Sequence, residues 1–196
     1  MSLKTKIIKI KGDWQEVVND CRSTVGKSEL GHDPSDSFKK SILIAEHSPI
    51  RDIIFKWKWE NIESWIATHF CRHKWECWIK TQRTDRTGVD RRELSQSAEV
   101  DFTGEANVQA LIDTARKRLC YMAAPETRAY MEDLKQAITE REPEIGNVLV
   151  PNCVYRGFCP ELSTCGFWNK FSSELTKDEI CSLARYDKYN QYFKNK

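Results

Sequence analysis

The sequence of 196 residues lacks any run of about 18 apolar residues, the length that a membrane-spanning helix requires. It also lacks a strong excess of one charge, since 31 basic residues face 29 acidic ones. Proteins that bind nucleic acids through charge usually carry a clearly basic balance. We therefore expect an ordinary globular protein, with neither a membrane nor a nucleic acid as its partner.

Cysteine, in contrast, is frequent, with eight residues. The opening segment Met1–Lys6 lacks the apolar core of a secretory signal, so we expect a cytoplasmic protein whose cysteines are thiols or metal ligands rather than disulfides. Cys153, Cys159 and Cys165 follow one another with five residues between each, and Cys120 or Cys181 could add a fourth. Structural zinc sites favour closer pairs, so the pattern favours buried or incidental thiols and we expect no metal.

Hydrophobic periodicity gives a coarse outline of the secondary structure. Alternating or β-branched segments predict strands at Ile7–Ile10, Ile53–Trp59 and Trp75–Thr81. Helical spacing predicts helices at Trp14–Arg22, Ser37–Ala45, Ile62–Cys71 (with Asn61 as N-cap), Glu105–Met122, Pro125–Arg141 and Asp178–Phe193. The polar segments Gly26–Ser37 and Gly88–Gly104 predict loops.

Strands and helices do not alternate in a βαβ rhythm, so the sequence predicts an α+β fold. We expect a mixed or antiparallel sheet packed against long helices. The length is typical of one domain, or at most two small ones. We expect one domain over residues 1–196, with a cysteine-rich C-terminal extension at about 146–196.

The densest group of chemically useful side chains lies in His69–Lys74 and Thr81–Arg86. Arginine binds phosphate or carbonyl oxygens through planar, paired N–H groups, and threonine adds a neutral donor. A second polar group lies on the predicted long helix, whose opposite face is apolar: Asn107, Gln109, Asp113, Arg116 and Arg118. Such a helix suits the wall of a polar pocket, although local spacing also fits a solvated basic face.

The segment Arg72–Lys74, followed by Thr81–Arg83, resembles the R-H-R and S-x-R motif of flavin-dependent thymidylate synthases, also called thymidylate synthase-complementing proteins. Lys74 replaces the final arginine, Thr81 replaces serine, and the acidic position holds Ile79 or Lys80. Further segments resemble the family in the same order: Glu46–Pro49, Asn107–Arg118 and Ala123–Arg128.

This resemblance implies the fold of that family and the FAD-dependent methylation of dUMP to dTMP. The carbon would come from methylene-tetrahydrofolate and the reducing equivalents from NADPH. Because the flavin supplies the chemistry, the protein mainly orients the rings and matches their charge. The resemblance also implies a homotetramer with its active site between subunits.

By position, the nucleotide would be bound by His69, Arg72, Thr81, Gln82, Arg83 and Arg118. Of these, Arg72 and Arg118 would be the catalytic residues and would face the uracil or the sugar-phosphate, and Arg118 near a uracil carbonyl would stabilise developing negative charge. FAD would contact Glu46, His47, Ser48, Arg72, His73, Lys74, Asn107, Gln109 and Asp113.

Several alternatives stay open at this stage. The departures from the motif at Lys74, Gln109 and Asp113 suit a relative that acts on another pyrimidine nucleotide or carbon donor. The basic clusters and the tryptophans also suit a non-enzymatic nucleotide-binding or nucleic-acid-binding module. His47 could simply cap a turn, His69 could be a partly buried structural histidine, and Asp113 could form a surface ion pair with Arg116 or Arg118.

Overall fold

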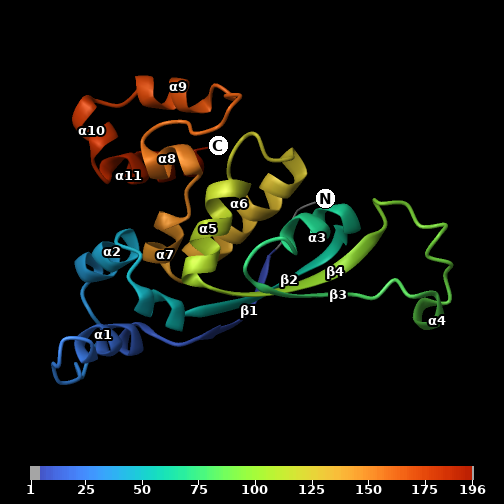
Figure 1. Cartoon of the computed structure of the whole chain (residues 1–196), viewed down its shortest axis with the longest axis horizontal. Helices are drawn as coiled ribbons and strands as arrows, with labels where there is room; N and C mark the ends of the chain where they lie inside the picture. Colours follow the sequence, from blue (N-terminus) through green and yellow to red (C-terminus); the bar gives the residue numbers. More distant parts are fainter. Residues whose placement is uncertain (1–4, 196) are drawn as a thin grey trace.

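The centre of the molecule is a four-stranded antiparallel sheet. The computed structural model describes residues 5–195, and within them the strand order is β1 (Lys6–Lys11), β2 (Ile54–Glu63), β4 (Glu99–Asn107) and β3 (Glu76–Ile79). Each neighbouring pair is antiparallel. Helices accompany this sheet without a βαβ repeat, which confirms the predicted α+β class (Figure 1).

One face of the sheet carries the main core. Along β2, Phe55, Trp57 and Trp59 are fully buried at alternate positions, as the period of a half-buried strand requires. Helices α3 (Ser64–Phe70), α5 (Val108–Arg118) and α6 (Pro125–Thr139) contact the sheet strands. The opposite face carries charges paired across strands: Lys11 and Lys56 with Glu105, and Lys58 with Asp101.

The N-terminal helices and the 3₁₀ turn extend the core at one end of the sheet. Helix α1 (Trp14–Ser23) packs on the turn η1 (Ser48–Asp52), which also contacts α5. Helix α2 (Asp36–Ile44) packs on α7 (Pro143–Val148), which continues from α6. The start of α5 is therefore held between the end of β4 and the turn that follows α2.

The C-terminal helices form a cap, defined here as residues 150–195. It contains α8 (Asn152–Arg156), α9 (Phe167–Ser173), α10 (Lys177–Cys181) and α11 (Ala184–Lys194), which lie away from the sheet in Figure 1. The cap has its own small cluster of buried residues, including Trp168, Phe171 and Tyr189. Helix α6 is tied to the cap by buried Lys135, whose Nζ donates to the Gly146 carbonyl (2.6 Å) and to Asn190 Oδ1 (2.7 Å).

The buried apolar residues form two clusters, one in the main core and one in the cap. The predicted single domain, with an extension at about 146–196, stays a prediction. Across residues 5–195, no helix combines the length and the apolar character needed to cross a membrane.

Three predicted boundaries were wrong. Glu99–Asn107 is strand β4, where we expected loop and then helix, so the long helix begins only at Val108. Asn61 does not cap a helix: its positive φ of 54° accompanies a register irregularity that lets β2 continue to Glu63. The predicted terminal helix is interrupted after Cys181, where α10 ends and α11 begins at Ala184.

A long arm leaves the sheet between β3 and β4. It comprises residues 80–98 and contains one helical turn, α4 (Thr84–Thr87). Figure 1 shows the arm projecting away from the rest of the molecule. The strand that leads into it, β3, is at the sheet edge and has two largely exposed apolar residues, Trp78 and Ile79.

The close contact between Gly104 on β4 and the Trp57 ring on β2 gives a test of the core packing. A Cβ added at Gly104 would collide with the Trp57 ring, which is fully buried and has no room to move. We expect Gly104→Ala to lower the free energy of unfolding by about 1–3 kcal/mol, measured by urea denaturation. Gly31→Ala, at a position with no heavy atom nearby, should change it by less than about 0.5 kcal/mol. Equal stability of the two variants would contradict this packing.

Candidate functional site

The end of α5 meets the turn after α3 through one arginine. Arg118 Nε donates to His73 Nε2 at 2.7 Å, and its Nη2 donates to the His69 carbonyl at 2.9 Å. Because a guanidinium only donates, Nε2 of His73 must be the acceptor and the ring proton of the neutral form lies on Nδ1. These contacts join segments 45 and 49 residues apart in the sequence.

Burial and positive charge keep both histidines of this cluster neutral. Burial first, and then Arg118, lower the pKa of His73 to about 4. The pKa of His69 is lowered by burial and then by Arg118 and Arg72. His69 Nδ1 also lies 3.0 Å from Thr127 Oγ1, a partner on α6. The environment is therefore one that disfavours additional positive charge.

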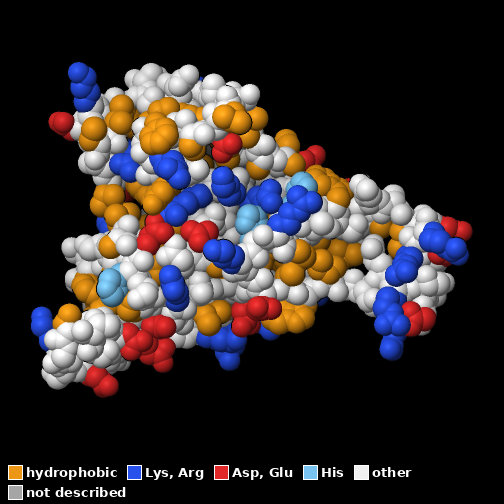
Figure 2. Space-filling model, in the orientation of Figure 1, with side chains coloured by type: hydrophobic (Ala, Val, Ile, Leu, Met, Phe, Trp, Pro, Cys, Tyr) orange, Lys and Arg blue, Asp and Glu red, His pale blue; other side chains and the backbone are white. Residues whose placement is uncertain are grey.

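Arg72 belongs to the same cluster. The pKa of Arg118 is lowered by burial and then by the charge of Arg72. Within residues 5–195, neither guanidinium forms an ion pair with a carboxylate. Because the charge of Arg72 acts on Arg118 and neither group has a carboxylate partner among those residues, this part of the surface is suited to an anion. Figure 2 shows basic side chains and histidines gathered across the middle of this face.

An open hollow of about 460 Å³ lies beside the cluster. Three of the predicted cofactor residues line it, namely His73, Lys74 and Asn107. Apolar atoms come from Ile54, Trp75 and Ala106, and carboxylates from Glu76 and Glu105. The Asn107 side chain is partly committed, since its Oδ1 accepts from Ala110 N at 2.9 Å and so caps α5. Its amide N–H groups stay available.

Three other predicted cofactor residues form a separate group around one carboxylate. Gln109 Nε2 donates to Glu46 (2.6 Å) and to Asp113 (3.3 Å). Arg116 pairs with both acids and lies over the Tyr155 ring. Glu46 has a positive φ of 50°, a conformation that is uncommon for a residue with a side chain. The structure thus brings Glu46, Gln109 and Asp113 together, but their polar atoms already bond to one another and to Arg116.

His47 and Ser48 lie at the turn between α2 and η1. His47 occupies the N-cap position of η1 without a side-chain cap, and its Nδ1 lies 3.9 Å from Cys21 Sγ on α1. Ser48 begins η1. Neither residue lines the hollow beside His73.

The predicted nucleotide-binding residues Thr81, Gln82 and Arg83 lie on the arm directly before α4. Arg83 forms a two-point pair with Asp85 (2.8 and 3.0 Å), and its side chain is largely exposed. Within one chain these residues do not join Arg72 and Arg118, because the arm carries the chain away from the sheet (Figure 1). A sequence motif does not indicate whether the segment between β3 and β4 folds back onto the sheet.

Sequence reasoning missed two features at this site. Trp75 is buried beneath the turn that carries His73, and its Nε1 donates to the Phe70 carbonyl at 2.6 Å. Cys71 and Cys77 have Sγ atoms 3.1 Å apart, which joins the start of the turn to β3. The sequence did not predict this contact, because the spacing of the two cysteines is uninformative. They meet because the chain reverses direction before β3.

The fold resembles that of a known enzyme. Two chains of the UMP/dUMP methylase PolB from Streptomyces cacaoi, bound with 5-Br dUMP and with 5-Br UMP, superpose with TM-scores of 0.61 and 0.57. Each match is 11% identical in sequence and covers 75% of this chain, and 94% and 93% of the respective PolB chains. No family model matches the sequence. No curated protein matches it either. The likeness therefore establishes a shared fold.

The Cys71–Cys77 contact predicts a specific cross-link. Mild treatment with a disulfide reagent should join these two sulfurs, with two protons and two electrons passing to the reagent. Peptide mapping after alkylation would identify the link, and Cys71→Ser should leave Cys77 open to alkylation. Full alkylation of both cysteines after oxidation would show that β3 and the turn are not held as described.

The lowered pKa of His73 predicts a pH dependence of stability. The unfolded chain takes up a proton at this residue near pH 6.5, whereas the folded chain does so only near pH 4. Stability should therefore fall as the pH drops through that window, and His73→Gln should flatten the slope. Urea denaturation at several pH values, with an NMR titration of the imidazole, would measure both effects. An imidazole that titrates near pH 6.5 in the folded protein would contradict the buried contact.

Proposed function

We propose that this chain binds a pyrimidine nucleotide at the cluster of Arg72, His73 and Arg118 and methylates its ring. The observation that carries the proposal is the Arg118 guanidinium, which is held by His73 and the His69 carbonyl, has no carboxylate partner among residues 5–195, and lies next to the hollow that His73 lines. A nucleotide offers the anionic phosphate and the carbonyl edges that such donors bind.

The geometry of Arg118 leaves donors free for this ligand. A guanidinium has five N–H groups, of which one donates to His73 and one to the His69 carbonyl, so three remain (5 − 2). The two internal bonds fix the plane of the group before any ligand arrives. A fixed plane favours binding because less side-chain freedom is lost on complex formation.

The fold gives independent support. The similar chain PolB is a UMP/dUMP methylase bound with brominated pyrimidine nucleotides, and almost its whole length superposes on this chain. Of the residues that suggested a nucleotide from the sequence, Arg118 bonds to the His69 carbonyl, and the charge of Arg72 lowers the pKa of Arg118. The fold and the local chemistry therefore agree on the ligand class.

FAD is the cofactor that we propose, and the residues of the hollow are compatible with its ring. Ile54, Trp75 and Ala106 give apolar contact, Lys74 gives a cation, and Asn107 gives amide donors. Glu105 adds a carboxylate there, but Lys11 and Lys56 already pair with it. His73, Lys74 and Asn107 would hold the flavin. When bound, the flavin would supply the reducing equivalents, with NADPH and methylene-tetrahydrofolate as co-substrates.

The chain's own residues would orient the nucleotide and stabilise charge. Arg118, held by neutral His73, would donate to a ring carbonyl and stabilise negative charge that builds on the pyrimidine. Neutral His73 would keep its Nδ1–H as a donor, and its low pKa prevents it from becoming a third cation. Arg72 would neutralise the phosphate.

The arm fits a site that two copies of the chain complete. Thr81, Gln82 and Arg83 lie outside the cluster of their own chain, directly before α4 on an arm that projects from an edge strand with exposed Trp78. In a homotetramer these residues would bind the nucleotide held by a neighbouring copy. Glu46, His47 and Ser48 would then contact FAD only at its margin.

An alternative within the same class is a different pyrimidine nucleotide. PolB carries both a UMP and a dUMP analogue, so this fold accommodates a ribose with or without its 2′-hydroxyl. Binding of a nucleotide without methyl transfer would indicate the non-enzymatic module instead.

The test combines binding and turnover. Purified protein should turn yellow on reconstitution with FAD, and dUMP or UMP with methylene-tetrahydrofolate and NADPH should give a 5-methylated nucleotide detected by mass spectrometry. Arg118→Ala should weaken dUMP binding by about 10- to 100-fold in calorimetry, because it removes charged hydrogen bonds worth about 1.5–3 kcal/mol.

The matched control is Arg141→Ala, an exposed arginine beyond α6, which should bind dUMP as the unchanged protein does. Arg118→Lys should bind with intermediate strength, since it keeps the charge but loses the planar fork. The proposal is wrong if the protein takes up no flavin and Arg118→Ala binds dUMP normally.

A further inference from the structure

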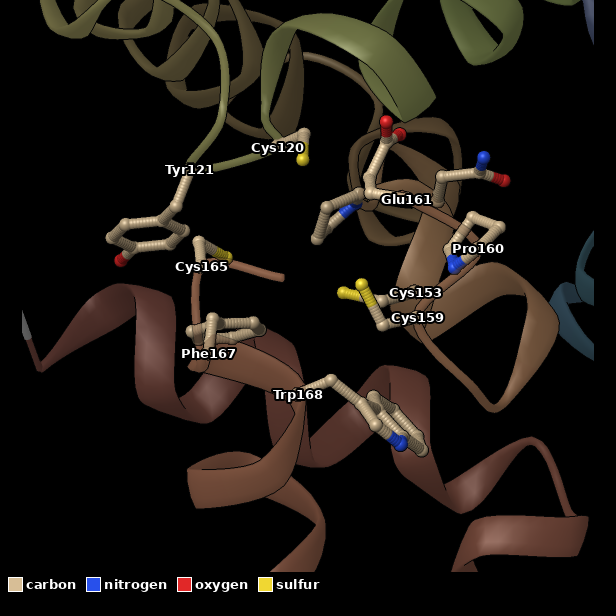
Figure 3. A pocket seen from close by; sticks show the side chains of 11 residues that line it. Cys120, Tyr121, Cys153, Cys159, Pro160, Glu161, Cys165, Phe167 and Trp168 are labelled. Atoms are coloured by element: carbon tan, nitrogen blue, oxygen red, sulfur yellow. The ribbon is translucent and has the colours of Figure 1, made fainter. Parts of the chain in front are cut away.

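Four of the eight cysteines line one small pocket at the base of the cap. Figure 3 shows Cys120, Cys153, Cys159 and Cys165 around it, together with Tyr121, Pro160, Phe167 and Trp168. Cys120 comes from the turn between α5 and α6, Cys153 from α8, and the other two from the loop between α8 and α9. The proposed nucleotide site uses none of these residues.

The four cysteines come from three segments of the chain that meet only in the fold, and the rest of the pocket lining is mainly aromatic and proline side chains. A thiolate in such surroundings is stabilised by a bound metal ion.

The volume of the pocket indicates whether it could hold a single metal ion or a larger metal cluster. The cavity volume is about 10 Å³, room for about one water-sized body. That space suits a single ion better than a multi-iron cluster. Cysteine sulfur selects thiophilic metals, and zinc closes its coordination shell with four such ligands.

The four sulfurs line the pocket without converging on one point. In the part of the chain that the structure describes, no three His, Cys, Asp or Glu side chains are grouped closely enough to hold an ion. Two of the cysteines lie on the irregular segment 157–166, which is bounded by Gly157 and Gly166, both at positive φ. Since metal binding commonly completes the folding of its own site, this segment can close on the ion.

The cap is the part of the molecule that a bound metal ion would stabilise most. Its buried core consists of a few side chains, and Leu162 in the loop is fully exposed. A unit this small has little apolar surface to bury and is often stabilised by a metal or by disulfides. A metal here would fasten the loop to α8 and to the turn after α5.

We propose that Cys120, Cys153, Cys159 and Cys165 bind one structural zinc ion that fastens the cap to the end of α5. Each thiol gives up its proton and forms one Zn–S bond, and no electrons are transferred. This replaces the expectation from the five-residue gaps that these thiols are incidental, because Cys120 joins them from another part of the chain.

The test measures metal in the full-length protein, purified anaerobically without chelator. Elemental analysis should give about one zinc per chain, and X-ray absorption should place four sulfurs at about 2.3 Å from it. Cobalt added to the metal-free protein should give the intense bands of tetrahedral cobalt thiolate. Cys159→Ser and Cys165→Ser should lose most of the zinc, whereas Cys181→Ser, an exposed cysteine outside the pocket, should keep it.

Because the spectroscopic measurements use the unchanged sequence, they decide the question even if a serine variant fails to fold. Absence of zinc together with silent cobalt spectra would overturn the proposal. So would disulfides among these cysteines, or iron with acid-labile sulfide in place of zinc. None of these readouts depends on flavin or nucleotide, so failure of the zinc site and failure of the proposed function are separate results.

Discussion

The bond between Arg118 and His73 is the constraint on which the candidate site depends. It fixes the end of α5 against the turn after α3, and both segments rest on the same face of the sheet. A half-buried, neutral imidazole accepts from a guanidinium, and that guanidinium has further N–H donors for a ligand. The charge of Arg72 close by makes an anionic ligand the natural partner of this arrangement.

A comparison of β2 with β4 shows why one strand was predicted from the sequence and the other was not. The alternation in β2 was clear because Phe55, Trp57 and Trp59 are large and alternate with lysines. Strand β4 has the same two-residue period from Val100 to Ala106, but Gly104 fills an inward position and the outward positions hold Asp101, Thr103 and Glu105, so the segment resembled a loop. The glycine is there because the Trp57 ring lies where a side chain would go.

The candidate site was predictable only in part, for a physical reason. The resemblance to a family, rather than local spacing, suggested that His69, His73 and Arg118 belong to one site, and they meet in the structure although the histidines lie 49 and 45 residues from Arg118. Thr81–Arg83 follow an arm whose direction no local pattern determines. For the cysteines, the sequence indicated Cys153, Cys159 and Cys165 but left the fourth open between Cys120 and Cys181; the packing of α8 on α5 brings Cys120 to the pocket.

The most direct test of the central claim is a crystal structure of the protein with dUMP. The proposal requires the phosphate or a uracil oxygen within hydrogen-bonding distance of the Arg118 guanidinium, with the Arg118–His73 bond intact and Thr81–Arg83 of a neighbouring copy close by. A nucleotide bound elsewhere, with Arg72 and Arg118 facing only solvent, would contradict it.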